Sequence, residues 1–274
     1  GTVAGYGAWL DRRVPWSFHP LRRSRGMQIR IYDDGAGRRS GSDAARDCLF
    51  VLGWGNRCRH ETVQWLVDRL AERYRVHVAE LPTHITDVER EWVAPLTEYT
   101  ADLDPFHVLS HSAGGLAVAH LEAEGLGNRV YLSPWWGSDY PLPGFVFSAL
   151  TSLPISRPGF PFSELEAEAL GALATDQQVA DSPTAASPAF LRTIDRTQRR
   201  LPPAREDAVA FCTLTDAIVD PRAVGHRLPA DRIRLYDGGH ELFSSTVRER
   251  LTETVLETLE RGPAGLRAAD PETP

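Results

Sequence analysis

Between residues 48 and 259, short apolar stretches alternate with stretches that place their apolar residues at helical spacing. Residues 48–52 form a continuous apolar run, which is typical of a strand buried on both faces of a parallel sheet. The next stretch carries apolar residues at positions i, i+3, i+4 and i+7 of one helix face, namely Val63, Leu66, Val67 and Leu70. Repeated units of this kind predict an α/β fold with a doubly wound, mostly parallel sheet and helices on both sides.

The alternation divides the chain into a core, residues 1–137 and 206–262, and an insertion. Residues 27–32 alternate cleanly, and we expect them to form an antiparallel edge hairpin with the weakly alternating residues 14–18 through a turn at 22–26. Residues 138–205 contain many prolines, several short helical patterns and no good strand, which predicts a helical lid inserted in the core. Residues 263–274 are expected to be a disordered tail.

Composition excludes several classes of protein. The net charge of −7 argues against a nucleic-acid binder, which would show a basic face. No apolar run approaches the roughly 18 residues of a membrane span, and no stretch at the start resembles a signal peptide. Three cysteines without a C-x-x-C pair suit a reducing compartment, so we expect the protein in the cytoplasm.

Residues 106–115, Phe-His-Val-Leu-Ser-His-Ser-Ala-Gly-Gly, lead from an apolar strand into the apolar start of a helix. A serine on such a strained strand-to-helix turn needs small residues two positions before and after it. Gly114 meets that need for Ser112, whereas Ser110 stands where glycine is usual. We expect Ser110 to be tolerated because its side chain is small, with some strain in the turn. The alternative is an ordinary small-residue loop between a strand and a helix.

Two polar loops later in the chain follow predicted strands. Asp216 follows the strand at 208–214, and His240 follows the strand at 232–236. The carboxyl ends of strands in a doubly wound sheet gather functional groups at one edge. A serine hydroxyl becomes a good nucleophile when a base takes its proton and an acid orients that base. Ser112, Asp216 and His240, in that order along the chain, are therefore candidates for a nucleophile, an acid and a base.

From about Met27 to Leu259 the chain resembles the α/β-hydrolase family. Residues 110–115 resemble its elbow, residues 216–219 its acid loop and residues 238–240 its histidine loop. The resemblance implies Ser112 as nucleophile, His240 as general base and acid, and Asp216 as orienting carboxylate. It also implies an oxyanion hole made by the backbone N–H groups of Trp54 and Ala113. The chain has Leu52-Gly53 where the family often has His-Gly, which weakens this part of the match.

Other residues leave alternatives open. Asp220 could replace Asp216 as the acid, and Asp139, after the strand at 129–133, is a rarer position for it. His111 is expected to be a structural residue of the elbow. The remaining histidines show no paired ligand spacing, so we expect no metal and no cofactor. Three aromatic residues are candidates to line the substrate pocket. Trp135 and Trp136 follow the strand at 129–133, and Phe145 lies in the lid.

A serine at the elbow favours acyl transfer over the chemistry of an aspartate nucleophile. The apolar lid favours a small-molecule carboxylic ester, of small to medium size, with an apolar acyl or alcohol group. A thioesterase, lipase, peptidase or C–C bond hydrolase could use the same triad. A ligand receptor on a hydrolase scaffold, without turnover, is an alternative of another class. The sequence does not indicate an oligomeric state.

Overall fold

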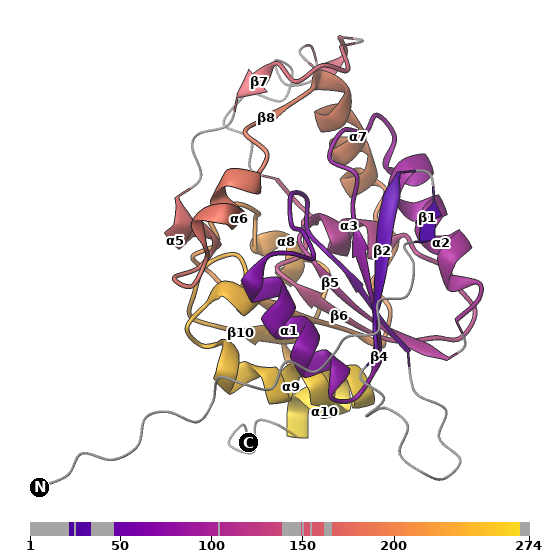
Figure 1. Ribbon diagram of the computed structural model, residues 1–274, viewed down its shortest axis with the longest axis vertical. Helices are drawn as coiled ribbons and strands as arrows, with labels where there is room; N and C mark the ends of the chain where they lie inside the picture. Colours follow the sequence, from indigo (N-terminus) through magenta and orange to yellow (C-terminus); the bar gives the residue numbers. More distant parts are fainter. Residues whose placement is uncertain are drawn as a thin grey trace, which may run out of the picture.

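The computed structural model describes residues 22–24, 26–33, 47–103, 105–138, 149, 151–153, 155–161 and 166–268. Eight strands form one sheet in the order β1-β2-β4-β3-β5-β6-β9-β10 (Figure 1). Their bounds are β1 (Arg22–Ser24), β2 (Met27–Tyr32), β3 (Asp47–Val51), β4 (Arg75–Glu80), β5 (Phe106–His111), β6 (Leu126–Leu132), β9 (Ala208–Cys212) and β10 (Ile233–Leu235). Only the pairs β1–β2 and β2–β4 are antiparallel among these strands. The prediction of a mostly parallel sheet is confirmed.

The strand order reverses at the centre of the sheet. From β3 the chain moves to β4 on one side, and it then returns to β5 on the other side of β3. The loops after β3 and β5 therefore leave the sheet in different directions. Such a switch point opens a crevice at the carboxyl ends of the strands, where ligands bind in open α/β sheets.

Helices cover both faces of the sheet. They are α1 (Glu61–Ala71), the π-helix η1 (Glu89–Val93), α2 (Ala94–Thr100), α3 (Ala113–Ala119), α8 (Arg222–Gly225), α9 (Arg248–Arg261) and α10 (Pro263–Ala268). Leu66 of α1 and Val255 of α9 share one core cluster with Phe50 of β3. Trp92 of η1 and Leu116 of α3 lie in the cluster on the opposite face. Because β3 is buried along its whole length, it reads in the sequence as a continuous apolar run.

The edge hairpin exists, but its first strand differs from the prediction. β1 occupies residues 22–24, which were expected to form the turn, and it pairs antiparallel with β2. The reversal is tight because Gly26 adopts a positive φ of 93°. Residues 14–18 lie outside the described residues.

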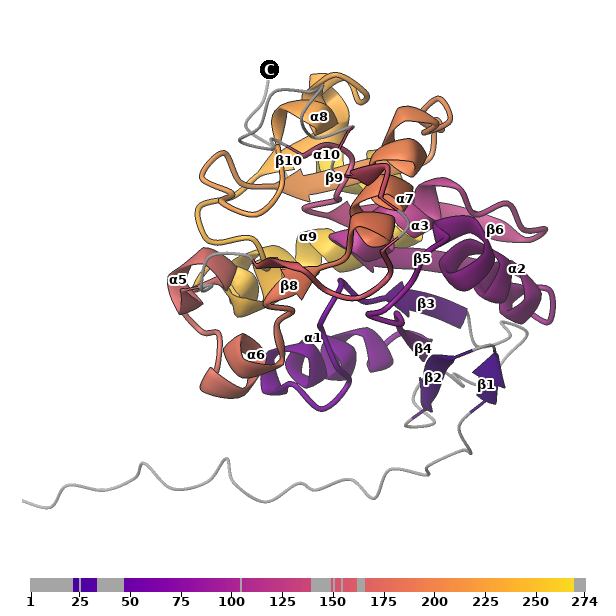
Figure 2. The same cartoon turned by 90° about the horizontal axis from the view of Figure 1, so that it is seen from above.

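The insertion joins β6 to β9. Its described elements are β7 (Phe160–Pro161), α5 (Ala167–Leu170), α6 (Asp176–Asp181), β8 (Ala185–Ala186) and α7 (Pro188–Arg199). The sequence predicts no good strand in this segment, and the strands found there, β7 and β8, are two residues long each and form a short antiparallel pair. In Figure 2, β8 and α7 lie between the viewer and the sheet.

Contacts show which end of the sheet the insertion meets. Thr193 of α7 accepts a hydrogen bond from the Val88 N–H, in the segment after β4. Phe190 of α7 stacks on Trp54, in the loop after β3, with ring centroids 4.3 Å apart. Because these loops follow the carboxyl ends of their strands, the insertion lies at the carboxyl edge of the sheet.

The prediction of a disordered tail is wrong for residues 263–268, which form α10. Gly262 ends α9 with a φ of 58°, and Pro263 begins the next helix at once. Leu266 of α10 is buried in the cluster that contains Leu259 of α9. Residues 269–274 lie outside the described residues. No helix in the described ranges is long and apolar enough to span a membrane.

Replacing Leu266 by alanine tests the packing of α10. Leu266 is 6% exposed, so its truncation should lower the free energy of unfolding. We expect a loss of about 2 kcal/mol, near the lower end of buried Leu→Ala changes, measured by urea denaturation. Leu235 is 50% exposed and serves as a matched control, for which Leu235→Ala should change stability by about 0.5 kcal/mol or less. Equal stability of Leu266→Ala and the wild type would show that α10 does not pack.

Candidate active site

Ser112 lies in the sharp turn between β5 and α3. Its backbone has φ 50° and ψ −117°, a sparsely populated conformation that costs about 1–3 kcal/mol. The Ser112 N–H donates to the carbonyl of Leu132 at 3.0 Å, and the Ser112 carbonyl accepts from the N–H groups of Gly115 and Trp135, both at 2.9 Å. Bonds from β6, from the loop after it and from α3 therefore hold this strained turn in place.

The helix after Ser112 approaches the end of β3 closely. A Cβ on Gly114 would lie 2.3 Å from the carbonyl oxygen of Val51, so only glycine fits. Ser110, on the other side of the turn, is buried, and its hydroxyl donates to the carbonyl of Val130 at 3.4 Å. Positive φ angles outside glycine occur, among the described residues, at Ser112 and Ser133. The strain of the turn therefore lies at Ser112 itself and not at Ser110.

The structure brings Asp216 and His240 together from the loops after β9 and β10. Nδ1 of His240 lies 2.7 Å from Oδ2 of Asp216. The other oxygen, Oδ1, accepts from the N–H groups of Ile218 at 2.8 Å and Val219 at 3.0 Å. The side chains of Asp216 and His240 are 0% and 3% exposed. This arrangement assigns the proton to Nδ1 and leaves Nε2 as an acceptor.

The contact shifts the pKa values of both partners. Burial alone would raise the pKa of Asp216, but the charge of His240 and its hydrogen bond, together with the two backbone N–H groups, hold that pKa below its ordinary value. Burial alone would lower the pKa of His240, but the charge and hydrogen bond of Asp216 and, to a smaller extent, the charge of Glu241 raise it above its ordinary value. The pair therefore stabilises a protonated imidazole within a buried site.

The loop that carries His240 rests on α5 of the insertion. The His240 N–H donates to the carbonyl of Ala169 at 2.9 Å. A Cβ on Gly239 would lie 2.6 Å from the carbonyl of Leu170, so the loop needs glycine to approach α5 this closely. From the opposite side, the phenol of Tyr236 donates to the carbonyl of Gly239 at 2.8 Å. Both contacts restrict where the imidazole can lie.

The histidine loop also meets the elbow. The ring of His111, the residue before Ser112, lies 4.7 Å from the ring of His240, centroid to centroid. The hydrogen bonds of the described residues include none between Ser112 Oγ and His240. The bond between a nucleophile and its base often tightens only in the substrate complex.

The two backbone groups predicted to form an oxyanion hole lie on the loops at the switch point. Ala113 is the first residue of α3, and the first N–H groups of a helix have no acceptor within it. Trp54 lies in the loop after β3, and its indole N–H donates to the carbonyl of Thr83 at 2.9 Å. The Trp54 ring stacks on Phe190 and lies 6.4 Å from the ring of Trp135. The oxyanion-hole roles themselves stay predictions.

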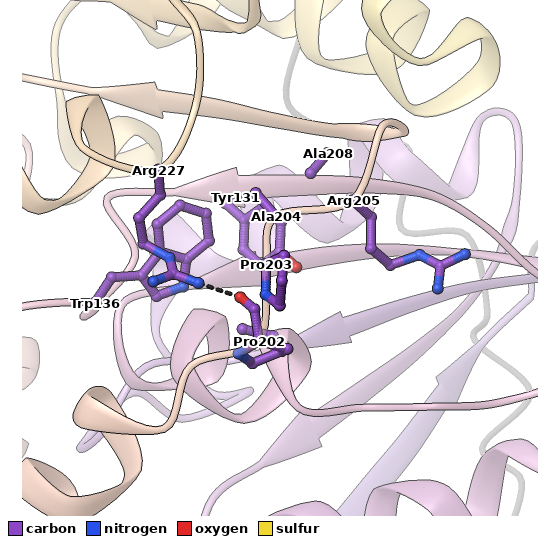
Figure 3. A pocket seen from close by; sticks show the side chains of 9 residues that line it. Tyr131, Trp136, Pro202, Pro203, Ala204, Arg205, Ala208 and Arg227 are labelled. Carbon is purple, nitrogen blue, oxygen red and sulfur yellow. Dashed lines mark hydrogen bonds between the residues drawn. The ribbon is translucent and has the colours of Figure 1, made fainter.

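Trp136 is a core residue. Its indole N–H donates to the carbonyl of Gly115 at 3.1 Å, and its ring meets Tyr131 edge-on at 4.8 Å. It lines a cavity of about 20 Å³, over which Arg227 reaches to the Pro202 carbonyl (Figure 3). The cavity has room for about one water molecule, and its lining does not include Ser112, Asp216 or His240. Phe145, the third aromatic residue predicted for the pocket, lies outside the described residues.

Of the two alternative acids, Asp220 lies in the described part of the chain, and its side chain pairs with Arg222. Asp220 Oδ1 accepts from the N–H and the Nε of Arg222 at 3.0 and 2.9 Å. Asp139 lies outside the described residues. Within those residues, no three His, Cys, Asp or Glu side chains gather in a way that could hold a metal ion. Asp216 is therefore the carboxylate that the structure places on the imidazole.

Sequence reasoning missed a buried polar network behind His240. Glu241 is 1% exposed and accepts from Asn56 Nδ2 at 2.7 Å and from Gln178 Nε2 at 2.9 Å. His111 Nδ1 lies 3.0 Å from Asn56 Oδ1, which joins the network to the elbow. The position of Glu241 directly after His240 was the one available signal. Asn56 and Gln178 belong to distant segments and carry no local pattern.

The fold resembles solved hydrolases. The monoacylglycerol lipase of Paleococcus ferrophilus has a TM-score of 0.59 at 18% identity, covering 80% of this chain and 94% of that one. A soluble variant of the monoglyceride lipase of Saccharomyces cerevisiae, solved with a substrate analog, has a TM-score of 0.67 at 14% identity, covering 94% and 99%. An esterase from Rhodococcus sp. has a TM-score of 0.53 at 16% identity, covering 89% and 99%. The TM-scores show a shared fold, and at such low sequence identities the similarity shows the fold alone.

No curated protein matches the sequence. A family model does: the model described as "Alpha/beta hydrolase family" matches residues 48–253. The matched range includes the elbow at Ser112 and the loops that carry Asp216 and His240. The match spans most of the 274 residues, and the chain belongs to the alpha/beta hydrolase family.

Proposed function

We propose that this protein is a serine hydrolase that cleaves a carboxylic ester of a small to medium apolar substrate through an acyl-enzyme intermediate. The observation that carries the proposal is the buried 2.7 Å contact between His240 and Asp216, on a loop packed against the elbow that presents Ser112. A base oriented by a carboxylate beside a strained serine has the parts that nucleophilic catalysis requires.

In the proposed reaction, Ser112 Oγ attacks the ester carbonyl carbon while Nε2 of His240 takes the hydroxyl proton. Asp216 holds the Nδ1–H and stabilises the imidazolium. The bond to the leaving oxygen then breaks, His240 gives its proton to the departing alcohol, and the acyl group stays on Ser112. A water molecule deprotonated by His240 then attacks the acyl carbon. The bond from that carbon to Ser112 Oγ breaks, His240 returns the proton to Oγ, and the carboxylic acid leaves.

The negative oxygen of the tetrahedral intermediate needs hydrogen-bond donors. We assign this role to the backbone N–H groups of Trp54 and Ala113, on the loops that diverge at the switch point. Donors fixed before the reaction stabilise charge that develops only in the transition state. Removal of one such donor typically costs ~2.7–4 kcal/mol of that stabilisation.

Aromatic side chains above the elbow favour an apolar substrate. Trp54, Trp135 and Phe190 form a cluster with ring centroids 4.3 to 6.4 Å apart. We assign Trp135 to the wall of the substrate pocket, with Trp136 in the core beneath it, and residues 138–205, including Phe145, to a lid.

Two of the similar structures are monoglyceride lipases and one is an esterase, which favours an ester over a thioester, an amide or a C–C bond. Three free cysteines suit the cytoplasm, where we propose that the protein acts.

Ser112→Ala should abolish turnover, because the nucleophile is lost. With a short p-nitrophenyl ester, we expect kcat/KM to fall by about 10⁴-fold or more and the burst of p-nitrophenol to disappear. A serine-directed phosphonate should label the wild type at Ser112, as found by peptide mapping. Ser110→Ala is the matched control and should keep activity within a few-fold, because Ser110 is buried in β5. Equal rates for the wild type and Ser112→Ala would instead favour a ligand receptor.

Asp216→Asn should lower kcat by about 10⁴-fold, because the imidazole loses its orienting carboxylate. Asp220→Asn is the control, since Asp220 pairs with Arg222 in the same loop. Steady-state kinetics of both variants decide the assignment. A large loss in Asp220→Asn, together with an active Asp216→Asn, would move the acid to Asp220.

The pH profile of kcat/KM should show an acid limb set by His240. The imidazole must be neutral to accept the proton of Ser112, and the Asp216 carboxylate raises the pKa of His240. Activity should therefore fall, as pH drops, at a pH above the ordinary pKa of histidine. In Asp216→Asn the limb should move to lower pH, since the larger of the two charges that raise the pKa of His240 is gone and only that of Glu241 remains. An acid limb that stays in place would contradict the assignment of the larger charge to Asp216.

A further inference from the structure

A second buried carboxylate lies beside His240, and no step of the proposed reaction uses it. Glu241 Oε1 accepts from Asn56 Nδ2 at 2.7 Å, while Oε2 accepts from Gln178 Nε2 at 2.9 Å and from Ser244 Oγ at 2.5 Å. A carboxylate is costly to bury unless hydrogen bonds satisfy its oxygens. The surroundings of Glu241 provide such hydrogen bonds to both of its oxygens. The donors come from three segments: Asn56 from the loop after β3, Gln178 from α6 and Ser244 from the residues after Glu241.

Gln178 brings the insertion into this network. It stands in the third position of α6, and its side chain is 1% exposed although α6 lies in the insertion. The Gln178 carbonyl oxygen accepts from the N–H of Thr175 at 3.1 Å, which completes the capping box of α6. Both polar atoms of the Gln178 amide are thus hydrogen-bonded, the oxygen to Thr175 at the start of α6 and the nitrogen to Glu241. The side chain has a fixed orientation.

Backbone bonds reinforce the same junction. The N–H of Glu241 donates to the carbonyl of Leu170 in α5 at 2.8 Å, and the N–H of Leu173 donates to the carbonyl of Ser244 at 2.8 Å. At the far end of α6, Asp181 meets His60 at 2.8 Å and Arg59 at 2.6 Å, just before α1. The segment 167–181 is therefore bonded to the core at both of its ends.

The network continues to the elbow. Asn56 lies two residues after Trp54 and joins Glu241 to the ring of His111, and His111 precedes Ser112. The ring of His111 packs 5.0 Å from Phe243 and 4.7 Å from His240. Glu241 thus contacts the loop after β3, through Asn56, and the insertion, through Gln178, and Asn56 connects it to His111 of the elbow.

We propose that Glu241 and Gln178 are positioning residues for His240, and that their buried contact makes the α5–α6 part of the insertion a fixed piece of the catalytic framework. The inference rests on the proposed function for its kinetic readout. Neither side chain touches substrate in this role. Without Gln178, the loop that carries His240 loses its side-chain tie to α6, and the imidazole shifts relative to Asp216 and Ser112. A misplacement of about 1 Å can cost roughly 100-fold in rate.

Gln178→Met tests the proposal, since methionine has a similar length and cannot hydrogen-bond to Glu241. We expect kcat for a p-nitrophenyl ester to fall by about 10- to 100-fold, with KM within about two-fold of the wild type. Gln177→Met is the matched control, because Gln177 is the neighbouring glutamine on the same helix and is exposed. Its kcat and KM should equal those of the wild type. A changed KM with an unchanged kcat would overturn the proposal and assign α6 to substrate binding.

A second variant and a second measurement distinguish a displaced His240 from a general loss of stability. Glu241→Gln keeps the shape of the side chain but replaces one acceptor by a donor, which then faces the donor amide of either Asn56 or Gln178, and it should show the same loss of kcat. Both variants should also shift or broaden the low-field ¹H NMR signal of the His240 Nδ1 proton at a temperature where circular dichroism shows a folded protein. Gln177→Met should leave that signal unchanged.

The two proposals can fail separately. Equal hydrolysis by the wild type and Ser112→Ala would refute the proposed function, while the NMR comparison of Gln178→Met with Gln177→Met would still decide the positioning role. An unchanged Nδ1 signal in both Gln178→Met and Glu241→Gln would overturn that role even if Ser112 proves to be the nucleophile.

Discussion

The strained backbone of Ser112 is the constraint on which the rest of the site depends. Its φ of 50° places the serine at the tip of the turn and needs support from outside the turn. That support comes from the carbonyl of Leu132 at the end of β6 and from the close approach of Gly114 to Val51 at the end of β3. Both strands neighbour β5 in the sheet. The parallel order of the central strands thus makes the turn possible, because the carboxyl ends of β3, β5 and β6 lie side by side next to the first residues of α3.

Two buried carboxylates differ in what surrounds them. Burial raises the pKa of both, but Asp216 faces the imidazole of His240 and two backbone N–H groups, and their combined effect lowers its pKa. The donors of Glu241 are the neutral groups of Asn56, Gln178 and Ser244, and burial prevails, so its pKa is raised. Asp216 is therefore hydrogen-bonded to the imidazole, whereas Glu241 joins segments of the chain and acts on the imidazole through its charge alone, which also raises the pKa of His240. The difference follows from the partners and not from the depth of burial.

Local pattern predicted the central elements well and the margins poorly. The apolar runs of β3 and β9 and the helical spacing in α1 and α9 were read correctly, since side-chain periodicity is a property of each segment alone. Weak alternation predicts the first strand of the hairpin at 14–18, whereas the turn at Gly26 makes residues 22–24 the partner of β2. A helix as short as α10 is marginal by itself and forms where Leu266 packs on α9.

Local patterns suffice to predict the alternating fold, the strand-to-helix turn at Ser112 and the two later loops with Asp216 and His240, because each consists of contiguous residues whose spacing indicates secondary structure. Long-range contacts in the folded chain are needed to show that Asp216, and not Asp220, meets the imidazole, and that Glu241 binds Asn56 and Gln178. These partners lie 185 and 63 residues from Glu241 along the chain. Contacts over such distances depend on how the sheet brings loops to one edge, which no local pattern encodes.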